Sequence, residues 1–184
     1  MEKVTLENLL KKNIDGKVIC FPTDTIYGVG VKYNDLDGID KIFKMKNRSE
    51  NKPLAILVPS KDISKYVLKI SDEAASFINN DWPGALTLIF KKSNLIDDKI
   101  TKGLTTVAFR MPNSKVALAI LEKFGPLATT SVNISGLPPL NDVSLIEKEF
   151  SDYIDYLVID LEKTIGKASR IIDVSSEDIK IIRN

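Results

Sequence analysis

Histidine is absent from the 184 residues, and cysteine occurs only once. Without histidine, the chain cannot use serine–histidine or cysteine–histidine catalysis, and it cannot form a histidine zinc site. The one cysteine, Cys20, lies inside an apolar run, so an internal disulfide and a cysteine metal cluster are also excluded. Any chemistry must therefore use other side chains.

Long apolar runs and an excess of one charge are also missing. No segment approaches the length of a membrane span, and charges interrupt the apolar runs of residues 1–13, which we interpret as an amphipathic helix rather than a signal peptide. We therefore expect a cytoplasmic, reducing location and no membrane partner. The 26 Lys and Arg residues nearly balance the 25 Asp and Glu residues. A uniform nucleic-acid-binding surface is thus not indicated, although a local basic cleft remains open.

The length predicts a single domain, residues 1–184. Predicted strands and helices alternate in the first two thirds, whereas the short spacing of the last strands predicts antiparallel pairs. We expect a mixed parallel and antiparallel α/β sheet flanked by helices. Helices are expected at 1–13, 35–45 and 142–150, and further helices are expected to begin at Ser60, at Ser71 and at Asn113 or Ser114. Strands are expected at 17–21, 54–58, 85–90, 105–110, 156–160, 170–174 and 179–183, and another is expected to begin at Leu127. Residues 91–103 are expected to form an exposed loop.

Residues 21–30, FPTDTIYGVG, are the stretch that packing alone explains least well. Pro22 ends the preceding strand, so residues 23–25 are expected on a turn at its carboxyl end, where ligands bind in α/β proteins. Gly28 and Gly30 allow a positive φ or the close approach of another group. The alternative is an ordinary turn, because Thr, Asp and Gly are common turn residues.

Three other stretches have a similar character. Residues 46–53, KNRSENKP, form either a solvated loop or a phosphate clamp. Arg110 ends a strand just before Met111-Pro112, and residues 129–136, TTSVNISG, place hydroxyls, an amide and a glycine after an apolar strand. These groups suit the binding of anions and hydroxylated ligands, and they suit phosphoryl or nucleotidyl transfer. The P-loop and Rossmann signatures are absent.

Six blocks occur in order along the chain: PTDTIYGVG, KMKNRSENKPL, WPGALTLIF, VAFRMP, TTSVNISG and ASRIIDV…IIRN. Their order and spacing resemble the YrdC-like family, whose central members are threonylcarbamoyl-AMP synthases. The resemblance runs from Val18 to Arg183. It implies a twisted, mixed α/β sheet with a basic cavity. It also implies a nucleotidyltransferase that makes L-threonylcarbamoyladenylate and pyrophosphate from L-threonine, bicarbonate and ATP, with Mg²⁺. Downstream tRNA threonylcarbamoyl transferase proteins then modify the adenosine beside the anticodon, and direct binding of tRNA is left open.

The resemblance also implies roles for individual residues. Lys46 and Arg48 are expected to hold the ATP phosphates and to be catalytic, and the planar fork of Arg110 suits the carboxylate of threonine. The ATP-binding positions are Lys46, Arg48, Lys52, Thr106, Ser131, Asn133 and Arg183, and the threonine-binding positions are Thr25, Tyr27, Arg110, Thr129 and Ser169; no protein metal site is expected. A surface ion pair is the alternative for Arg183.

Some positions depart from the family pattern, and other functions remain open. Ser49, Leu57, Pro139 and Arg170 replace residues that many or some members have, and Asp24 has no assigned role beyond orienting its loop. A C-terminal extension domain is not expected, so the chain resembles the short form of the enzyme. The alternatives are a non-catalytic module that binds tRNA or double-stranded RNA, and a paralogue that acts on another carbamoyl acceptor.

Overall fold

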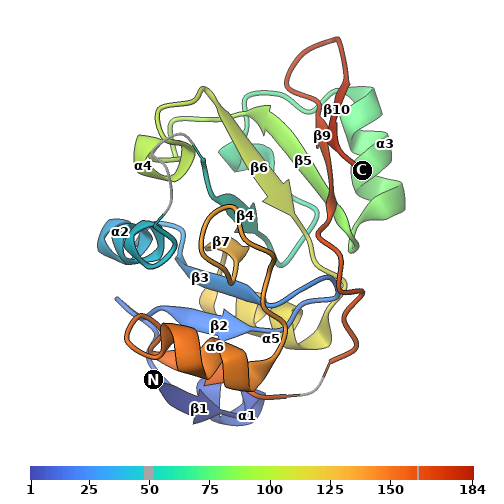
Figure 1. Ribbon diagram of the computed structural model, residues 1–184. Helices are drawn as coiled ribbons and strands as arrows, with labels where there is room; N and C mark the ends of the chain where they lie inside the picture. The colour runs from blue at the N-terminus through green and yellow to red at the C-terminus, as the bar shows by residue number, and fades with distance from the viewer. Residues whose placement is uncertain (48–51, 161) are drawn as a thin grey trace.

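The computed structural model describes residues 1–47, 52–160 and 162–184 (Figure 1). The predicted role of Arg48 and the departure at Ser49 thus lie outside the described residues. The strands are β1 (Glu2–Val4), β2 (Ile19–Phe21), β3 (Gly28–Lys32), β4 (Ala55–Leu57), β5 (Leu86–Lys91), β6 (Thr106–Arg110), β7 (Leu127–Ser131), β8 (Tyr156–Val158), β9 (Arg170–Asp173) and β10 (Lys180–Arg183). Within the described ranges, these ten strands form one sheet in the order β1-β8-β2-β3-β7-β4-β6-β5-β9-β10.

The directions of the strands confirm the predicted mixed sheet. β3 is antiparallel to β2 and β7, and β4 is antiparallel to β7, whereas β4 is parallel to β6. β8 runs parallel to both β1 and β2. At the other edge, β5 is antiparallel to β6 and parallel to β9, and β9 and β10 form the antiparallel pair that the short C-terminal spacing predicts.

Helices flank this sheet. They are α1 (Leu6–Leu9), α2 (Leu36–Met45), α3 (Asp72–Asp81), α4 (Asp98–Thr101), α5 (Lys115–Phe124) and α6 (Val143–Phe150), with a 3₁₀ helix η1 (Ser64–Tyr66). The longer helices begin where short polar side chains can cap them. Asp35, Ser71, Ser114 and Asp142 each accept a hydrogen bond from a backbone N–H in the first turn. The predicted starts at Asp35 and Ser71 are confirmed, and Ser114 rather than Asn113 is the cap of α5.

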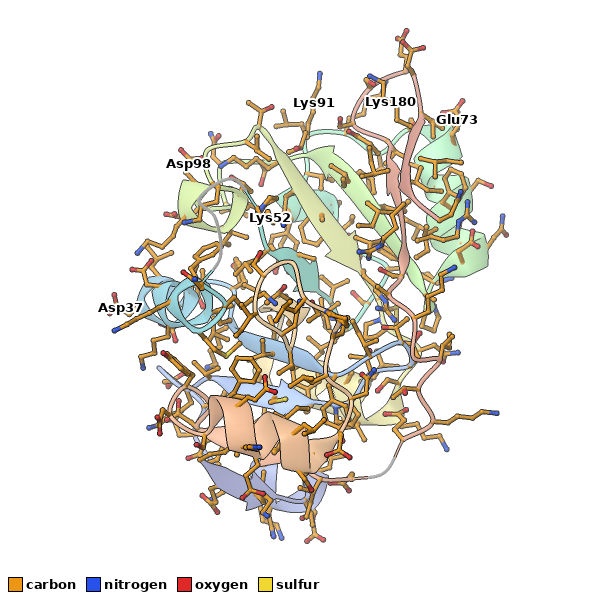
Figure 2. All side chains as sticks on the ribbon, viewed as in Figure 1. Asp37, Lys52, Glu73, Lys91, Asp98 and Lys180 are labelled. Atoms are coloured by element: carbon orange, nitrogen blue, oxygen red, sulfur yellow. The ribbon has the colours of Figure 1, made fainter. Side chains whose placement is uncertain are left out.

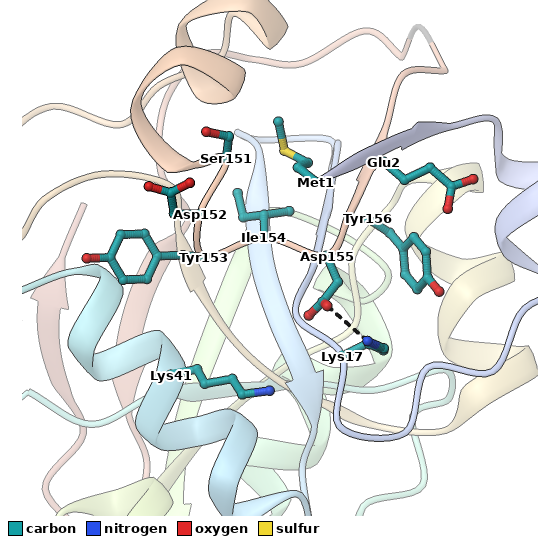
Figure 3. A pocket seen from close by; sticks show the side chains of 10 residues that line it. All are labelled: Met1, Glu2, Lys17, Lys41, Ser151, Asp152, Tyr153, Ile154, Asp155 and Tyr156. Carbon is teal, nitrogen blue, oxygen red and sulfur yellow. Dashed lines mark hydrogen bonds and ion pairs between the residues drawn. The ribbon is translucent and has the colours of Figure 1, made fainter.

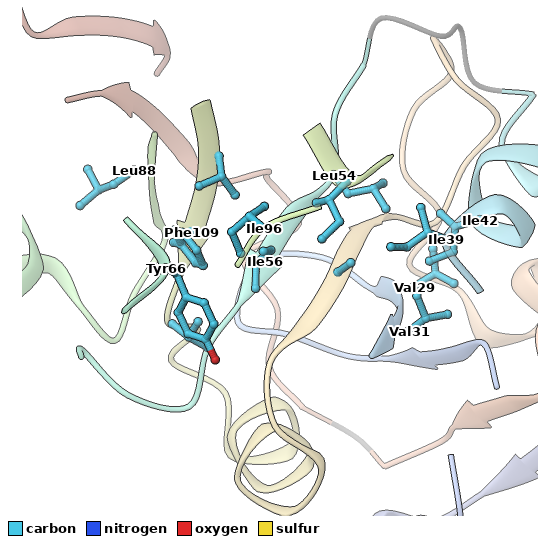
Figure 4. Close-up of a cluster of buried hydrophobic side chains, with 14 of the residues drawn as sticks. Val29, Val31, Ile39, Ile42, Leu54, Ile56, Tyr66, Leu88, Ile96 and Phe109 are labelled. Atoms are coloured by element: carbon cyan, nitrogen blue, oxygen red, sulfur yellow. The ribbon is translucent and has the colours of Figure 1, made fainter. Parts of the chain in front are cut away.

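Two apolar clusters cover opposite faces of the sheet. The larger cluster packs Val29, Ile56 and Phe109 from the strands together with buried residues of α2, α3 and α6 (Figure 4). The smaller cluster packs Leu57 and Leu127 against α1 and α5. Because successive strand residues point to opposite faces, neighbours such as Ile56 and Leu57 belong to different clusters.

Small residues form a row on the face that carries the smaller cluster. The register aligns one residue from each of β3, β7, β4, β6 and β5, namely Gly30, Thr129, Ala55, Ala108 and Ile89. Paired residues point to the same side of a sheet, so these five share one face. Ala55, Ala108 and Ile89 are partly exposed. Gly30 and Thr129 are buried. We call this row the floor.

The prediction of one helix over residues 1–13 is wrong. Glu2–Val4 forms β1 instead, and only Leu6–Leu9 is helical. β1 pairs with β8, the Glu2 N–H donates to the carbonyl of Asp155 at 2.8 Å, and Val4 is buried. The available strand edge and the burial of Val4 outweigh the local helical pattern, as tertiary context often does.

Two loop and helix assignments are also wrong. Residues 91–103 are not simply an exposed loop, because they include α4 and bury Ile96 and Ile100 in the larger cluster. The two isoleucines lie four residues apart and both pack into the larger cluster. The charged residues between them make this apolar spacing hard to recognise in the sequence. Ser60 does not begin a helix, and only the short η1 follows it.

Gly30 makes the close approach that the sequence allows, whereas Gly28 does not. Both lie in β3 without a positive φ. A Cβ on Gly30 would lie 2.6 Å from Cγ2 of Thr129 and 3.1 Å from the carbonyl oxygen of Ala128, whereas the nearest atoms to a Cβ on Gly28 are 3.8 Å away. The floor therefore excludes any side chain at Gly30.

We predict that Gly30→Ala lowers the free energy of unfolding by about 1–3 kcal/mol, which is typical of overpacking. Gly28→Ala, with ordinary contact distances, should change it by less than about 1 kcal/mol. Adding Thr129→Ser to Gly30→Ala removes the closest clashing atom and should recover part of the loss. Urea unfolding of the four proteins measures this, and equal stability of the two alanine variants would contradict the close approach at Gly30.

Candidate functional site

The loop of residues 22–27, which joins β2 to β3, is held in shape by Thr23. Its hydroxyl donates to the carbonyl of Ile26 at 2.7 Å and accepts from the N–H groups of Thr25 and Ile26. The hydroxyls of Thr23 and Thr25 lie 3.0 Å apart. Since the Thr23 proton is used on Ile26, Thr25 donates to Thr23 and keeps its lone pairs for another partner. We call residues 22–27 the site loop.

Arg110 is that partner, and it is almost completely buried. Its Nη1 donates to Oγ1 of Thr25 at 2.7 Å, its Nε donates to the carbonyl of Gly84 at 2.9 Å, and its Nη2 forms an ion pair with Asp24. The side chains of Arg110 and Asp24 are only 7% and 13% exposed. Burial lowers the pKa of Arg110, an effect that the carboxylate of Asp24 opposes and the positive charge of Arg183 reinforces.

The twist of the sheet makes this contact possible. In a flat sheet Gly28 and Arg110 would lie about 20 Å apart, because three strand spacings and four residues along the strands separate them. The bonds from Arg110 to Asp24 and Thr25 join these distant positions directly. A right-handed twist rotates β6 relative to β3, so the end of β6 and the site loop approach each other across the face that carries the floor.

Ser169 and Arg183 extend the cluster around Arg110. The hydroxyl of Ser169 lies 2.8 Å from that of Thr87 on β5. Nε of Arg183 donates to the carbonyl of Ser169 at 2.8 Å, so the guanidinium is held by Ser169 rather than by a carboxylate of the described residues. Leu88 pairs with Phe109 in the antiparallel strands β5 and β6, so Thr87 lies opposite Arg110. Two of the predicted positions, Ser169 and Arg183, therefore lie beside Arg110.

Lys46 forms the second polar cluster, with Ser131 and Asn133. It follows α2 and is only 1% exposed. Its Nζ donates to the carbonyl of Ser131 and, at 2.6 Å, to Oδ1 of Asn133. Asn133 also accepts from the hydroxyl of Ser131 at 2.7 Å and donates to the carbonyls of Ile134 and Leu137. The amide thus shapes the loop after β7 while it holds the ammonium group.

The floor lies between the two clusters. Thr106 and Arg110 lie two residues on either side of Ala108 along β6, and Ser131 lies two residues beyond Thr129 along β7. Side chains two residues apart in a strand share a face. Thr106, Arg110, Thr129 and Ser131 therefore point to the floor side of the sheet. Four predicted positions that are distant in sequence thus share one surface.

Tyr27 and Lys52 are the remaining predicted positions among the described residues. Tyr27 is buried in the larger apolar cluster, and burial raises the pKa of its hydroxyl to about 12. Tyr27 directly precedes Gly28, so its side chain lies on the face of the sheet opposite the floor. Lys52 is exposed at the entrance to β4 (Figure 2).

The residues that depart from the family pattern lie in different environments. Leu57 is buried in the smaller cluster, where its packing is that of an ordinary core residue. Pro139 and Arg170 are exposed.

Neither of two cavities that lie in the described part of the molecule is strongly basic. One of about 600 Å³ adjoins the site loop and is lined by Asp24, Gly84, Ala85, Asn113, Lys163, Thr164 and Ile165. The other, about 440 Å³, contains none of the predicted site residues and includes the ion pair between Lys17 and Asp155 (Figure 3). Neither of these two cavities is therefore the basic cavity that the resemblance implies.

Metal and membrane features are also absent from the described ranges. No group of three or more His, Cys, Asp or Glu side chains there could hold a metal ion. Among the helices described, none is long and apolar enough to cross a membrane.

Asp24 and Thr87 are the contacts that sequence reasoning left unassigned or missed. The expectation that Asp24 orients its loop is consistent with its ion pair to Arg110. The signal for Thr87 is weak: it is a single hydroxyl in an apolar strand, on the same face as Ile89. The backbone carbonyl of Gly84 carries no sequence signal at all.

We predict that Asp24→Ala lowers the free energy of unfolding by about 3–5 kcal/mol, because it leaves the cation of Arg110 buried without its counter-ion. Replacing both partners, in Asp24→Ala/Arg110→Met, should cost less than Asp24→Ala alone. Asp178→Ala, at an exposed position, is the matched control and should change stability by less than about 0.5 kcal/mol. Urea unfolding measures all three, and a double variant no more stable than Asp24→Ala would contradict this account.

Comparisons with known proteins agree with this geometry. The Sua5/YciO/YrdC family model, described as "Telomere recombination", matches residues 12–184. A protein of Pyrococcus abyssi named threonylcarbamoyl-AMP synthase is 36% identical over 88% of this chain and 48% of its own length. A relative in Methanocaldococcus jannaschii is 36% identical over 98% of this chain and 86% of its own length.

A solved structure shares the fold. The crystal structure of P. abyssi Sua5 complexed with L-threonine has a TM-score of 0.92 and 30% identity, and the match covers 100% of this chain and 57% of that one. This chain therefore spans about half the length of the P. abyssi protein. The fold, the shared face of the predicted polar residues and the match over residues 12–184 lead to one conclusion: the chain belongs to the Sua5/YciO/YrdC family.

Proposed function

We propose that this protein is a threonylcarbamoyl-AMP synthase, a nucleotidyltransferase that converts L-threonine, bicarbonate and ATP to L-threonylcarbamoyladenylate and pyrophosphate. The observation that carries the proposal is the pairing of an arginine cluster and a lysine cluster on either side of the floor. Relatives that bear this enzyme name and a P. abyssi protein complexed with L-threonine support it.

The Arg110 end of the floor suits the amino acid. Guanidinium has five N–H donors, and three of those on Arg110 are bonded to Asp24, Thr25 and Gly84. Two donors remain for a carboxylate, and Arg183 adds a second positive charge nearby. With the carboxylate fixed there, the amine of threonine reacts with bicarbonate to give the carbamate and water.

The Lys46 end suits the nucleotide. The carbamate oxygen attacks the α-phosphorus of ATP, the bond between the α-phosphorus and the α,β-bridging oxygen breaks, and pyrophosphate leaves. Both reactants are anions, so the step depends on cations and on positioning more than on a strong base. Lys46 would turn its ammonium group from Ser131 and Asn133 to the phosphates, while Thr106 and Ser131 face the nucleotide from the floor.

Mg²⁺ enters this scheme as part of the substrate MgATP. The described residues offer no cluster of carboxylates for the ion, and Mg²⁺ commonly binds through substrate phosphates and waters. Transfer of the threonylcarbamoyl group to tRNA by other proteins, direct contact with tRNA, and the cytoplasmic location stay predictions.

We expect pyrophosphate release from MgATP that depends on both L-threonine and bicarbonate and stops when EDTA removes Mg²⁺. The folded, purified protein is assayed for pyrophosphate, and threonylcarbamoyladenylate is identified by mass spectrometry. Absence of product would contradict the proposal. RNA binding that falls steeply with salt, without adenylate formation, would favour the non-catalytic module. A preference for another amino acid in a panel of substrates would favour the paralogue.

The two ends of the floor should respond differently to substitution. Lys46→Ala should lower kcat/KM for ATP about 100-fold, because it removes a cation that acts on the transition state. Lys44→Ala, an exposed neighbour in α2, is the matched control and should leave kinetics within twofold. Arg110→Lys keeps the charge but loses the fork, so it should chiefly raise KM for threonine, by about tenfold. Steady-state kinetics are measured with each substrate varied in turn. Equal effects of Lys46→Ala and Arg110→Lys on the constants for both substrates would contradict these assignments.

A further inference from the structure

Residues 162–166, which we call the strap, run alongside the site loop on its outer side. The N–H groups of Ile165 and Gly166 each donate at 2.8 Å, to the carbonyls of Asp24 and Thr25 respectively. The carboxylate of Glu162 fixes the other end of the strap at the start of α5. It accepts from the hydroxyl of Ser114 and, at 2.8 Å, from the N–H of Lys115. The strap is therefore attached at one end to the site loop, which contacts Arg110, and at the other end to the start of α5.

The cavity of about 600 Å³ lies between this strap and the Arg110 cluster. Asp24 and Gly84, two of its lining residues, are direct partners of Arg110. Lys163 from the strap is exposed and lines the same cavity, so it is open to solvent. The cavity is thus lined by an exposed cation and by two direct partners of the buried arginine.

The lining chemistry matches a zwitterion. Asp24 supplies a carboxylate whose Oδ1 faces Arg110, and Oδ2 has no hydrogen bond to any described residue. That oxygen is available to an ammonium group, while Lys163 is available to a carboxylate. Asn113 and Thr164 add an amide and a hydroxyl, and Gly84 and Ala85 leave room. A simple anion would face the negative charge of Asp24, whereas an amino acid satisfies both charges.

We propose that this cavity is the entrance through which a zwitterionic amino acid reaches Arg110. Lys163 attracts the carboxylate, Asp24 receives the ammonium group, and the carboxylate then passes to the free donors of Arg110. The inference rests on the proposed function for the identity of the amino acid, L-threonine. It adds a role for Lys163 and for the outer oxygen of Asp24.

Charge reversal at two lysines of this segment tests the entrance. Lys163→Glu should raise KM for L-threonine about fivefold at low salt, because attraction becomes repulsion at a solvent-exposed site. The effect should shrink at 0.5 M salt, and kcat and KM for ATP should stay within twofold. Lys167→Glu makes the same change in net charge four residues away, at an exposed position that does not line the cavity, and should leave all constants within twofold.

A binding measurement separates this inference from the proposed function. Titration of the full chain with L-threonine, without ATP, is followed by NMR, and Lys163→Glu should weaken binding about fivefold relative to Lys167→Glu. L-threoninamide, which lacks the carboxylate, should not bind more weakly to Lys163→Glu than to the wild type. Urea unfolding confirms that both variants are folded.

The outcomes are distinct. Threonine binding that depends on Lys163, in a protein that makes no adenylate, would support the entrance and contradict the proposed function. Adenylate formation with equal effects of the two glutamate variants, or with none, would overturn the entrance alone. Failure of the wild type to bind L-threonine at all would overturn it as well.

Discussion

The buried ion pair between Arg110 and Asp24 is the contact on which the candidate site depends. A guanidinium group that is only 7% exposed needs a counter-ion and hydrogen-bond acceptors, and it takes them from Asp24, Thr25 and Gly84. These partners lie in different parts of the chain, so one side chain fixes the site loop, the end of β6 and the turn before β5 together. The loop is therefore organised before any ligand arrives, which reduces the cost of binding.

The floor imposes a second constraint, which concerns size rather than charge. Three of its five residues are glycine or alanine, and a Cβ at Gly30 would meet Thr129 at 2.6 Å. On the opposite face the same strands carry Val29, Ile56 and Phe109, which pack into the larger cluster. The larger apolar cluster thus lies on one face of the sheet, and the floor lies on the other, beside the smaller cluster. Polar side chains at the strand ends can then act on a ligand that lies across the strands.

The parts of the fold that were predictable are those in which local and tertiary preferences agree. Asp35 and Ser71 cap helices whose apolar spacing already predicts them. Pro22 and the hydroxyls after it mark the end of β2, as expected. The prediction fails for residues 1–13, because the pairing of β1 with β8 depends on a strand more than 150 residues away. It also fails for residues 91–103, because Ile96 and Ile100 are separated by charges.

The candidate site likewise has residues whose placement was predictable from the sequence and residues whose placement was not. Thr106, Arg110, Thr129 and Ser131 share a face, as a sheet that brings together the ends of several strands requires. The ring of Tyr27 packs in the core, because it alternates with Gly28 and so faces the other way. The strap had no signal in the sequence, since its bonds to the site loop use backbone N–H groups. In the proposed reaction, the charges of the two clusters suit different ligands. Arg110 and Arg183 against Asp24 leave one positive charge, which suits a single carboxylate accompanied by an ammonium group, whereas the several charges of a triphosphate would be repelled by Asp24. We therefore propose the Lys46 end for the phosphates, with the floor between them and the threonine carboxylate.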